Sequence, residues 1–175
     1  MRDSPAKLKK MLDVFKSGNP FNDPNFKQDK SMLPAEIRSI CRGFSRPDPD
    51  CFLVDDSDNA YDVRQGAIGN CYMISAIGIL AKKYCEKMLG INEWQNPYGA
   101  YMVRFKKMGR DIYVIIDDQF AVGVDNSWLL GRSETEKELY VNIIEKAFAK
   151  LYGGYDKIVG GKVNITLSEM TGGFP

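Results

Sequence analysis

The chain has 175 residues, of which 44% are hydrophobic and 27% charged, a composition that fits one globular domain and argues against a disordered, collagenous or coiled-coil protein. Its 24 basic and 23 acidic side chains leave a formal charge of +1, which provides no broad electrostatic surface for nucleic acid or an anionic membrane. The longest apolar stretch, residues 73–81, is far shorter than the roughly 20 residues of a membrane span, and the first ten residues lack the apolar core of a signal peptide. We therefore expect a cytoplasmic protein with no transmembrane segment and no nucleic-acid partner.

Six of the eight prolines fall in the first sixty residues, where they interrupt short helical stretches such as residues 7–15. This pattern predicts an irregular lead-in, with residues 1–19 as a loosely ordered extension of a single domain that covers residues 1–175. Residues 72–83 are apolar on nearly every side, which predicts a helix buried in the middle of the domain. Asn70 is a favoured N-cap residue, so this helix is expected to begin with Cys71 in its first turn.

A β-hairpin is predicted in the middle of the chain. Apolar and polar residues alternate over residues 101–106 and again over residues 112–116, which is the periodicity of strands with one buried face. The segment Lys107–Arg110 between them contains a glycine and is predicted to form the turn.

Two further helices are predicted after the hairpin. Ser133-x-x-Glu136 has the pattern of a capping box and predicts the start of a long amphipathic helix, which Gly153-Gly154 should end. The apolar face of this helix comprises Leu139, Tyr140, Ile143, Ile144, Ala147, Phe148 and Leu151. A last short helix is expected between Gly161 and Thr171. Helices and a small antiparallel sheet together indicate an α+β domain.

The chain contains no histidine, so it lacks the commonest general base and the commonest transition-metal ligand. A catalytic proton relay based on imidazole would need a histidine from elsewhere. The four cysteines form no CxxC pair and no zinc-ligand spacing, and a cytosolic setting keeps thiols reduced. Cys41, Cys51 and Cys85 have no setting that would activate them, so they are predicted to be structural.

Cys71 is the candidate nucleophile, because the unpaired N–H groups in the first turn of a helix favour the thiolate. An acyl-transfer site also needs donors for the developing oxyanion, and the Gln65 amide and the Cys71 backbone N–H could supply them. Gly66 and Gly69 would let the intervening turn fold back so that both donors reach one point. The alternative is that Cys71 is a small buried hydrophobic residue at the start of a core helix, and the residues alone leave the two interpretations about even.

Residues 65–72, with the sequence Gln-Gly-Ala-Ile-Gly-Asn-Cys-Tyr, resemble the active-site segment of the calpain family of cysteine proteases. Residues 143–155, 159–162 and 171–173 are similar to further stretches of the same domain, in the same order. The family usually has Asp-Cys-Trp where this chain has Asn70-Cys-Tyr72. An aromatic residue is kept, and a charge beside the thiol is lost.

The resemblance implies a papain-like cysteine protease fold, of which this chain is the first half, with a central buried helix that begins at the catalytic cysteine. It implies that Cys71 is the nucleophile and Gln65 the oxyanion donor of a calcium-dependent endopeptidase that cleaves intracellular proteins through a thioacyl-enzyme. The histidine and asparagine of the triad would come from a second subdomain, downstream or in trans. The isolated chain is therefore expected to be inactive.

Acidic residues before the helix suggest calcium binding, because Ca²⁺ takes oxygen ligands. The run Asp55–Asp58 does not follow the EF-hand pattern, and a solvated acidic loop is the simpler interpretation. The resemblance implies that Asp62 and Glu145 are two carboxylate ligands of a calcium ion. From the residues alone, Glu145 is equally a surface residue paired with Lys146 or Lys150 on one helix.

Two other functions stay open. One is a calpain-like regulatory or protein-interaction module that keeps the fold without turnover, which the lack of histidine fits equally well. The other is a calcium-sensing binding module, which would keep its metal affinity after Cys71 is removed.

Overall fold

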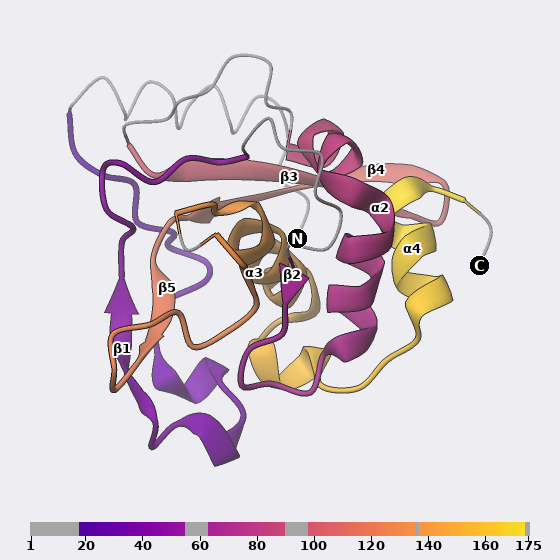
Figure 1. The fold of residues 1–175 in the computed structure, drawn as a ribbon. Coiled ribbons are helices and arrows are strands. Elements are labelled where there is room, and N and C mark those ends of the chain that lie inside the picture. The colour runs from indigo at the N-terminus through magenta and orange to yellow at the C-terminus, as the bar shows by residue number, and fades with distance from the viewer. Residues whose placement is uncertain (1–17, 55–62, 90–97, 136, 174–175) are drawn as a thin grey trace.

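Three α-helices and three two-stranded antiparallel sheets form the part of the chain that the structure describes, residues 18–54, 63–89, 98–135 and 137–173 of a computed structural model (Figure 1). The helices are α2 (Cys71–Leu89), α3 (Tyr140–Tyr152) and α4 (Val163–Thr171). The sheets pair β1 (Cys41–Ser45) with β5 (Phe120–Gly123), β2 (Val63–Arg64) with β6 (Arg132–Ser133), and β3 (Ala100–Lys107) with β4 (Arg110–Asp117). Short 3-10 turns lie at η1 (Lys30–Met32), η2 (Ala35–Ile37) and η3 (Tyr155–Ile158). This content confirms the predicted α+β class.

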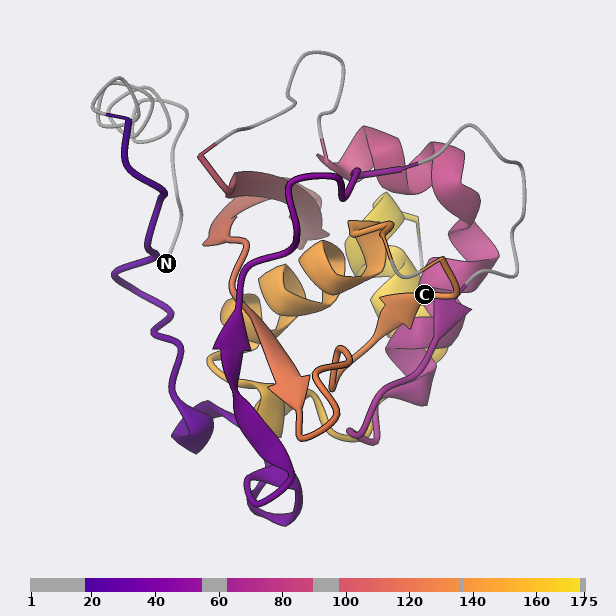
Figure 2. The ribbon, with the colours of Figure 1, turned by 60° about the vertical axis from the view of Figure 1, so that its left-hand side comes forward.

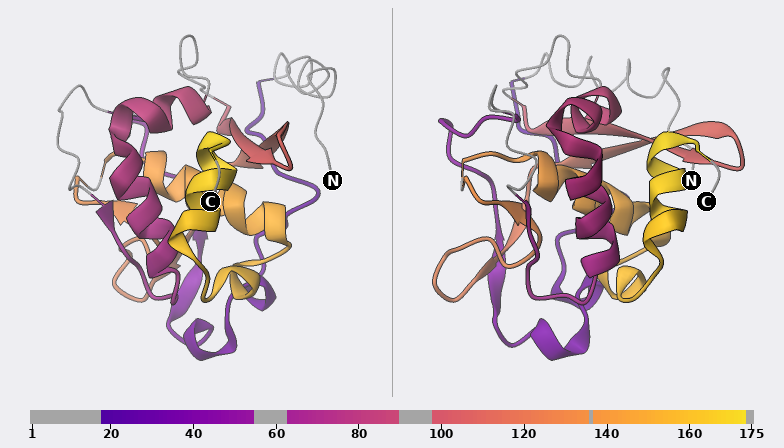
Figure 3. Two further views of the ribbon diagram at one scale, coloured as in Figure 1. Left: turned by 90° about the vertical axis from the view of Figure 1, so that its right-hand side faces the viewer. Right: turned by 45° about the vertical axis from the view of Figure 1, so that its right-hand side comes forward.

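Helix α3 runs through the middle of the molecule, with α2 and α4 on one side and the β1–β5 pair on the other (Figures 1 and 2). Helices α2 and α4 lie side by side (Figure 3). Every residue of α3 from Tyr140 to Ala149 is buried, because its apolar face packs into the core while its charged residues are covered from the other side. Gly153 ends the helix in a left-handed conformation, with φ of 99°, as predicted.

Helix α2 begins at Cys71, as predicted, but it is not buried on every side. Residues four apart lie on one helical face, and Cys71, Ser75 and Ile79 are all exposed, Ile79 at 64% of its surface. On the opposite face Met73 and Ala76 are completely buried. One face of this helix therefore packs into the core, and the face that starts with Cys71 is open.

The capping-box prediction is wrong at its serine. Helix α3 begins at Tyr140, whereas Ser133 lies in β6 and pairs with Val63 of β2. Its hydroxyl donates a hydrogen bond to the Glu138 carboxylate. Pairing with a strand far away in the sequence overrides the local capping pattern, and Glu136, the other half of that pattern, lies outside the described residues.

The hairpin prediction is confirmed. Strands β3 and β4 pair in register from Ala100 opposite Asp117 to Lys107 opposite Arg110. The two turn residues, Met108 and Gly109, both have positive φ, 51° and 70°, as a tight two-residue hairpin turn requires.

The described part of the lead-in is irregular, as predicted, but buried charges fix it to the core. Lys150 of α3 donates to Asp23 at 2.7 Å, and the Asp23 N–H donates to Asp117 at 2.7 Å. The other oxygen of Asp117 pairs with Lys146, and both side chains are fully buried. The predicted helical stretch at residues 7–15 lies outside the described residues, as does most of the predicted extension, residues 1–17. No helix in the described part of the chain has the length and apolar character needed to cross a membrane.

Candidate active site

The loop that precedes Cys71 is pinned against the segment between β5 and β6. The N–H of Ala67 donates to the carbonyl of Leu129 at 2.9 Å. A Cβ at Gly66 would lie 2.2 Å from the carbonyl carbon of Leu130, so this close approach of two backbones needs a glycine. The carbonyl of Gly69 accepts a hydrogen bond of 2.8 Å from the N–H of Gly160. These contacts fix the conformation of the loop between Gln65 and the cysteine.

The thiol of Cys71 lies at the surface, at the N-terminal end of α2. The N–H groups of Met73 and Ile74 bond to the Asn70 carbonyl at 2.9 and 3.2 Å, so Cys71 occupies the first helical position, where its own N–H has no partner within the helix. The interpretation of Cys71 as a buried core residue is wrong, because Cys71 is the exposed cysteine. The arrangement has the features of an accessible nucleophile beside an unpaired backbone donor.

The other three cysteines are less suited to react. Cys41 and Cys85 are buried and Cys51 is partly buried. Burial raises the pKa of the Cys51 thiol and raises that of Cys85 to about 12. Because a reagent must reach the thiolate for it to react, exposure sets Cys71 apart from the other three cysteines.

Gln65 is exposed at the start of the same loop. Its side-chain Nε2 donates a hydrogen bond of 2.7 Å to the carbonyl of Ile68. A primary amide has two N–H groups, so one holds the side chain against the loop and the second remains for a ligand. The two predicted oxyanion donors, the Gln65 amide and the Cys71 N–H, thus lie at the two ends of one loop, which backbone hydrogen bonds hold in place.

Tyr72 anchors a second segment beside the nucleophile. Its hydroxyl donates to the carbonyl of Ile158 at 3.0 Å, and a Cβ at Gly161 would lie 2.5 Å from its ring. Desolvation is the main reason that the pKa of Tyr72 is raised. The motif at residues 159–162 therefore packs, through Gly161, against the aromatic residue next to Cys71.

Glu145 lies in the core behind the nucleophile. It is 1% exposed, its Oε1 accepts a hydrogen bond of 2.6 Å from Asn70 Nδ2, and its Oε2 accepts one of 2.9 Å from the Gly131 N–H. The interpretation of Glu145 as a surface residue paired with Lys146 or Lys150 is therefore wrong. Burial raises the pKa of Glu145 to about 7, although both hydrogen bonds oppose the rise.

Of the two predicted calcium ligands, Glu145 lies among the described residues. Asp62 and the acidic run at residues 55–58 lie outside the described residues. Among the described residues, no group of three or more Asp, Glu or Cys side chains could hold a metal ion. Glu145 nevertheless provides a buried carboxylate, and the buried Asn70 Oδ1 has no hydrogen-bond partner among the described residues. Both are oxygen donors of the kind that Ca²⁺ accepts, so the donor chemistry fits.

A cavity of about 460 Å³, here called the Gln65 cavity, opens beside the loop between Gln65 and Cys71. Gln65 and Gly66 line one part of it, and Trp128 and Arg132 line another. The ring of Trp128 packs edge-on against that of Phe120. No local pattern in the sequence indicates that Trp128 also lines a cavity with Gln65, because this relation depends on contacts between distant segments.

An exposed cysteine at the first turn of a helix, a glutamine in the loop before it and an α+β core define the cysteine-bearing subdomain of a papain-like fold. Residues 21–175 match the family model described as calpain family cysteine protease.

Curated relatives agree with this match. The chain is 34% identical to calpain-5 of Caenorhabditis elegans, over 95% of this chain and 27% of that protein. It is 36% identical to the calpain-type cysteine protease DEK1 of Zea mays, over 89% of this chain and 7% of that protein. It is 31% identical to calpain-5 of Mus musculus, over 72% of this chain and 21% of that protein. The chain belongs to the calpain family of cysteine proteases and spans less than a third of the length of these relatives.

Proposed function

We propose that this chain supplies the nucleophile and the oxyanion donors of a calcium-dependent endopeptidase that acts on protein substrates in the cytoplasm. The observation that carries the proposal is the exposed thiol of Cys71 at the start of α2, with the Gln65 amide held in the same loop. The histidine and asparagine that complete the site come from a second subdomain, since this chain has no histidine.

The chemistry follows from these positions. The Cys71 sulfur attacks the scissile carbonyl carbon, and the electron pair of the C=O bond moves to the oxygen, where the Gln65 amide and the Cys71 N–H stabilise the negative charge. The histidine takes the thiol proton and gives it to the leaving amine as the C–N bond breaks. Water then hydrolyses the thioester and regenerates the thiol.

The open face of α2 supports a second subdomain as a partner. Cys71, Ser75 and Ile79 follow one another along this face, and Ile79 is 64% exposed. A subdomain that packs on this face would cover the apolar side chain and bring its histidine to the side of the helix that carries the thiol. Burial of the apolar surface on this face would provide the driving force for the association.

Calcium dependence is part of the proposal and rests on the family resemblance together with Glu145. A buried carboxylate is costly unless it is paired, and the donors to Glu145 among the described residues, Asn70 and Gly131, are both neutral. Calcium, when bound through Glu145 and Asp62, would supply the positive charge that keeps Glu145 ionised. Because Asn70 joins Glu145 to the residue before the nucleophile, such a site would also order the start of α2.

A fusion of a calpain second subdomain, bearing the histidine and asparagine, after Pro175 tests the proposal. We expect calcium-dependent cleavage of casein that disappears in Cys71→Ser and falls sharply in Gln65→Ala. Cys51→Ser is the matched control, because it removes a thiol outside the site and should leave cleavage unchanged. Cleavage that survives Cys71→Ser would refute the assignment of the nucleophile. A folded fusion that stays inactive would favour the alternative, a calpain-like interaction module without turnover, which the lack of histidine fits equally well.

A further inference from the structure

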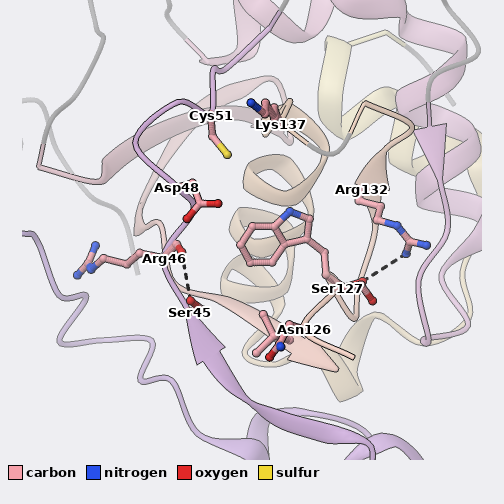
Figure 4. A pocket seen from close by; sticks show the side chains of 10 residues that line it. Ser45, Arg46, Asp48, Cys51, Asn126, Ser127, Arg132 and Lys137 are labelled. Atoms are coloured by element: carbon pink, nitrogen blue, oxygen red, sulfur yellow. Dashed lines mark hydrogen bonds between the residues drawn. The ribbon is translucent and has the colours of Figure 1, made fainter. Parts of the chain in front are cut away.

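Two cavities lie next to each other, and the first of them is the Gln65 cavity. The Gln65 cavity shares three lining residues, Ser127, Trp128 and Arg132, with a second cavity of about 420 Å³. The second cavity is shown in Figure 4, where Arg46, Asp48 and Cys51 lie along one side and Ser127 and Arg132 along the other. The shared residues form the partition between the two cavities.

Arg132 is the basic residue that lines the Gln65 cavity. Its side chain extends away from Arg46 and Asp48 (Figure 4). Its guanidinium donates one hydrogen bond, of 3.3 Å, to the carbonyl of Trp128. It makes no ion pair with a carboxylate in the part of the chain that the structure describes. Since a guanidinium has five N–H donors, most of its hydrogen-bonding capacity remains for a ligand.

The other basic residues of this region are already paired. Arg46 pairs with Asp118, and Lys137 pairs with Asp50 at the surface. Arg64 lies directly opposite Arg132 in the antiparallel β2–β6 pair, on the same face of the sheet, and is paired with Glu134. Among these cations, Arg132 alone has no carboxylate in contact within the described part of the chain.

Asp125 is the acidic residue that lines the Gln65 cavity. Its Oδ1 accepts hydrogen bonds from the N–H and the hydroxyl of Ser127, at 3.1 and 2.8 Å. These bonds dominate the lowering of its pKa, and attraction to Arg132 is the smallest contribution. Asp125 is therefore held by Ser127 and competes only weakly for Arg132.

We propose that the Gln65 cavity is a substrate subsite that takes an acidic side chain, with Arg132 pairing to its carboxylate and Trp128 covering the neighbouring apolar part of the peptide. The inference rests on the proposed function, because Gln65, the proposed oxyanion donor, also lines this cavity, and a peptide bound at its amide would have the cavity beside it. Arginine suits this role because its planar guanidinium can bind a carboxylate through two parallel hydrogen bonds. The subsite selects polypeptides with a glutamate or aspartate close to the cleaved bond.

Peptide binding to the full chain tests the subsite without any need for turnover. Trp94→Phe leaves Trp128 as the single tryptophan, so its fluorescence reports on the cavity. The probes are two capped octapeptides of Gly, Ser and Leu that differ only in one central residue, Glu or Gln. We expect the Glu peptide to bind about three to ten times more tightly at low salt, the range of a partly exposed charge-assisted pair, with less preference at high salt.

Three variants in the Trp94→Phe background decide between outcomes. Arg132→Gln should abolish the preference for Glu, whereas Lys137→Gln, which removes a cation of the second cavity that is already paired with Asp50, should keep it. Asp125→Asn should increase the preference by removing the competing carboxylate. A preference that persists in Arg132→Gln overturns the proposal, as does equal or absent binding of both peptides at millimolar concentration. An Arg132-dependent preference together with an inactive fusion would keep the subsite and reject the protease proposal, so the two failures are distinguishable.

Discussion

Asn70 Nδ2 donates a hydrogen bond of 2.6 Å to Glu145, which joins the residue before the nucleophile to a buried carboxylate 75 positions further along the chain. The other oxygen of Glu145 accepts a hydrogen bond from the N–H of Gly131. Gly131 directly precedes strand β6, which pairs with β2 just before Gln65. Glu145 therefore links three segments that converge behind Cys71. Its protonation state should influence the stability of the whole site.

The first prediction concerns pH. In the native state the pKa of Glu145 is about 7, above its ordinary value of 4.5, so the folded chain holds a proton that the unfolded chain releases between these values. The free energy of unfolding should therefore fall as the pH rises from 4.5 to 7, by about 3 kcal/mol in the absence of calcium. Urea unfolding at several pH values in the presence of a chelator measures this slope.

Glu145→Gln is the matched control for the pH prediction. Its amide can accept from the Gly131 N–H, and the Asn70 Oδ1 that has no partner in the described structure is available as an acceptor for its NH₂ group. The variant should fold and lose the part of the pH dependence that Glu145 causes. An unchanged slope in Glu145→Gln would show that other groups produce it.

The second prediction concerns calcium. A ligand that binds only the native state raises its stability as RT ln(1 + [L]/Kd), so calcium at 100 times its Kd should add about 2.7 kcal/mol. The gain should be larger at pH 8 than at pH 5, because the ion would bind ionised Glu145. Thermal unfolding with calcium and with a chelator provides the test. If Asp62→Ala or Glu145→Ala shows the same calcium-induced shift in melting temperature as the unchanged chain, the substituted residue is not a calcium ligand.

The third prediction concerns thiol reactivity. Iodoacetamide at neutral pH should modify Cys71 at least about ten times faster than any other cysteine, because accessible thiolate determines the rate. Cys41 and Cys85 are buried, and desolvation raises the pKa of Cys51. Peptide mapping by mass spectrometry at short reaction times gives the four rates. Faster modification of Cys51 in the native chain would contradict this order.

The fourth prediction concerns Gly66. In Gly66→Ala the new methyl group would overlap the backbone of Leu130, and the two segments would have to separate. We expect a loss of about 1–3 kcal/mol in the free energy of unfolding, as for other overpacked sites, and slower acylation of Cys71. Gly43→Ala in β1 is the control, since a Cβ there meets no atom within 4 Å. Equal stability of the two variants would show that the close approach is not required.

Local patterns in the sequence predicted the parts of the site that depend on neighbouring residues. The start of α2 at Cys71 followed from Asn70 and the apolar run after it, and the exposed thiol and the loop that carries Gln65 agree with the motif. The turn at Met108 and Gly109 could likewise be predicted, because segments of alternating apolar and polar residues flank it on both sides.

Contacts between distant segments could not be predicted in the same way. Ser133 has the local pattern of a helix cap, but its pairing with Val63 places it in a strand. The burial of Glu145 depends on Asn70 and Gly131, which are 75 and 14 residues away. A run of apolar residues also cannot show that Ile79 lies on an open face, because periodicity is lost when nearly all positions are apolar.

The rate of peptide hydrolysis by the purified 175-residue chain tests the central claim most directly. General acid–base catalysis contributes about 10²–10⁴-fold, and the loss of one cooperating member of a catalytic unit can cost more. Because the chain has no histidine, we predict negligible hydrolysis of a fluorogenic peptide with or without calcium, and no difference between the chain and its Cys71→Ser variant. Robust hydrolysis that disappears in Cys71→Ser would show that another residue of this chain supplies the base, and it would contradict the assignment of this chain as half of a catalytic site.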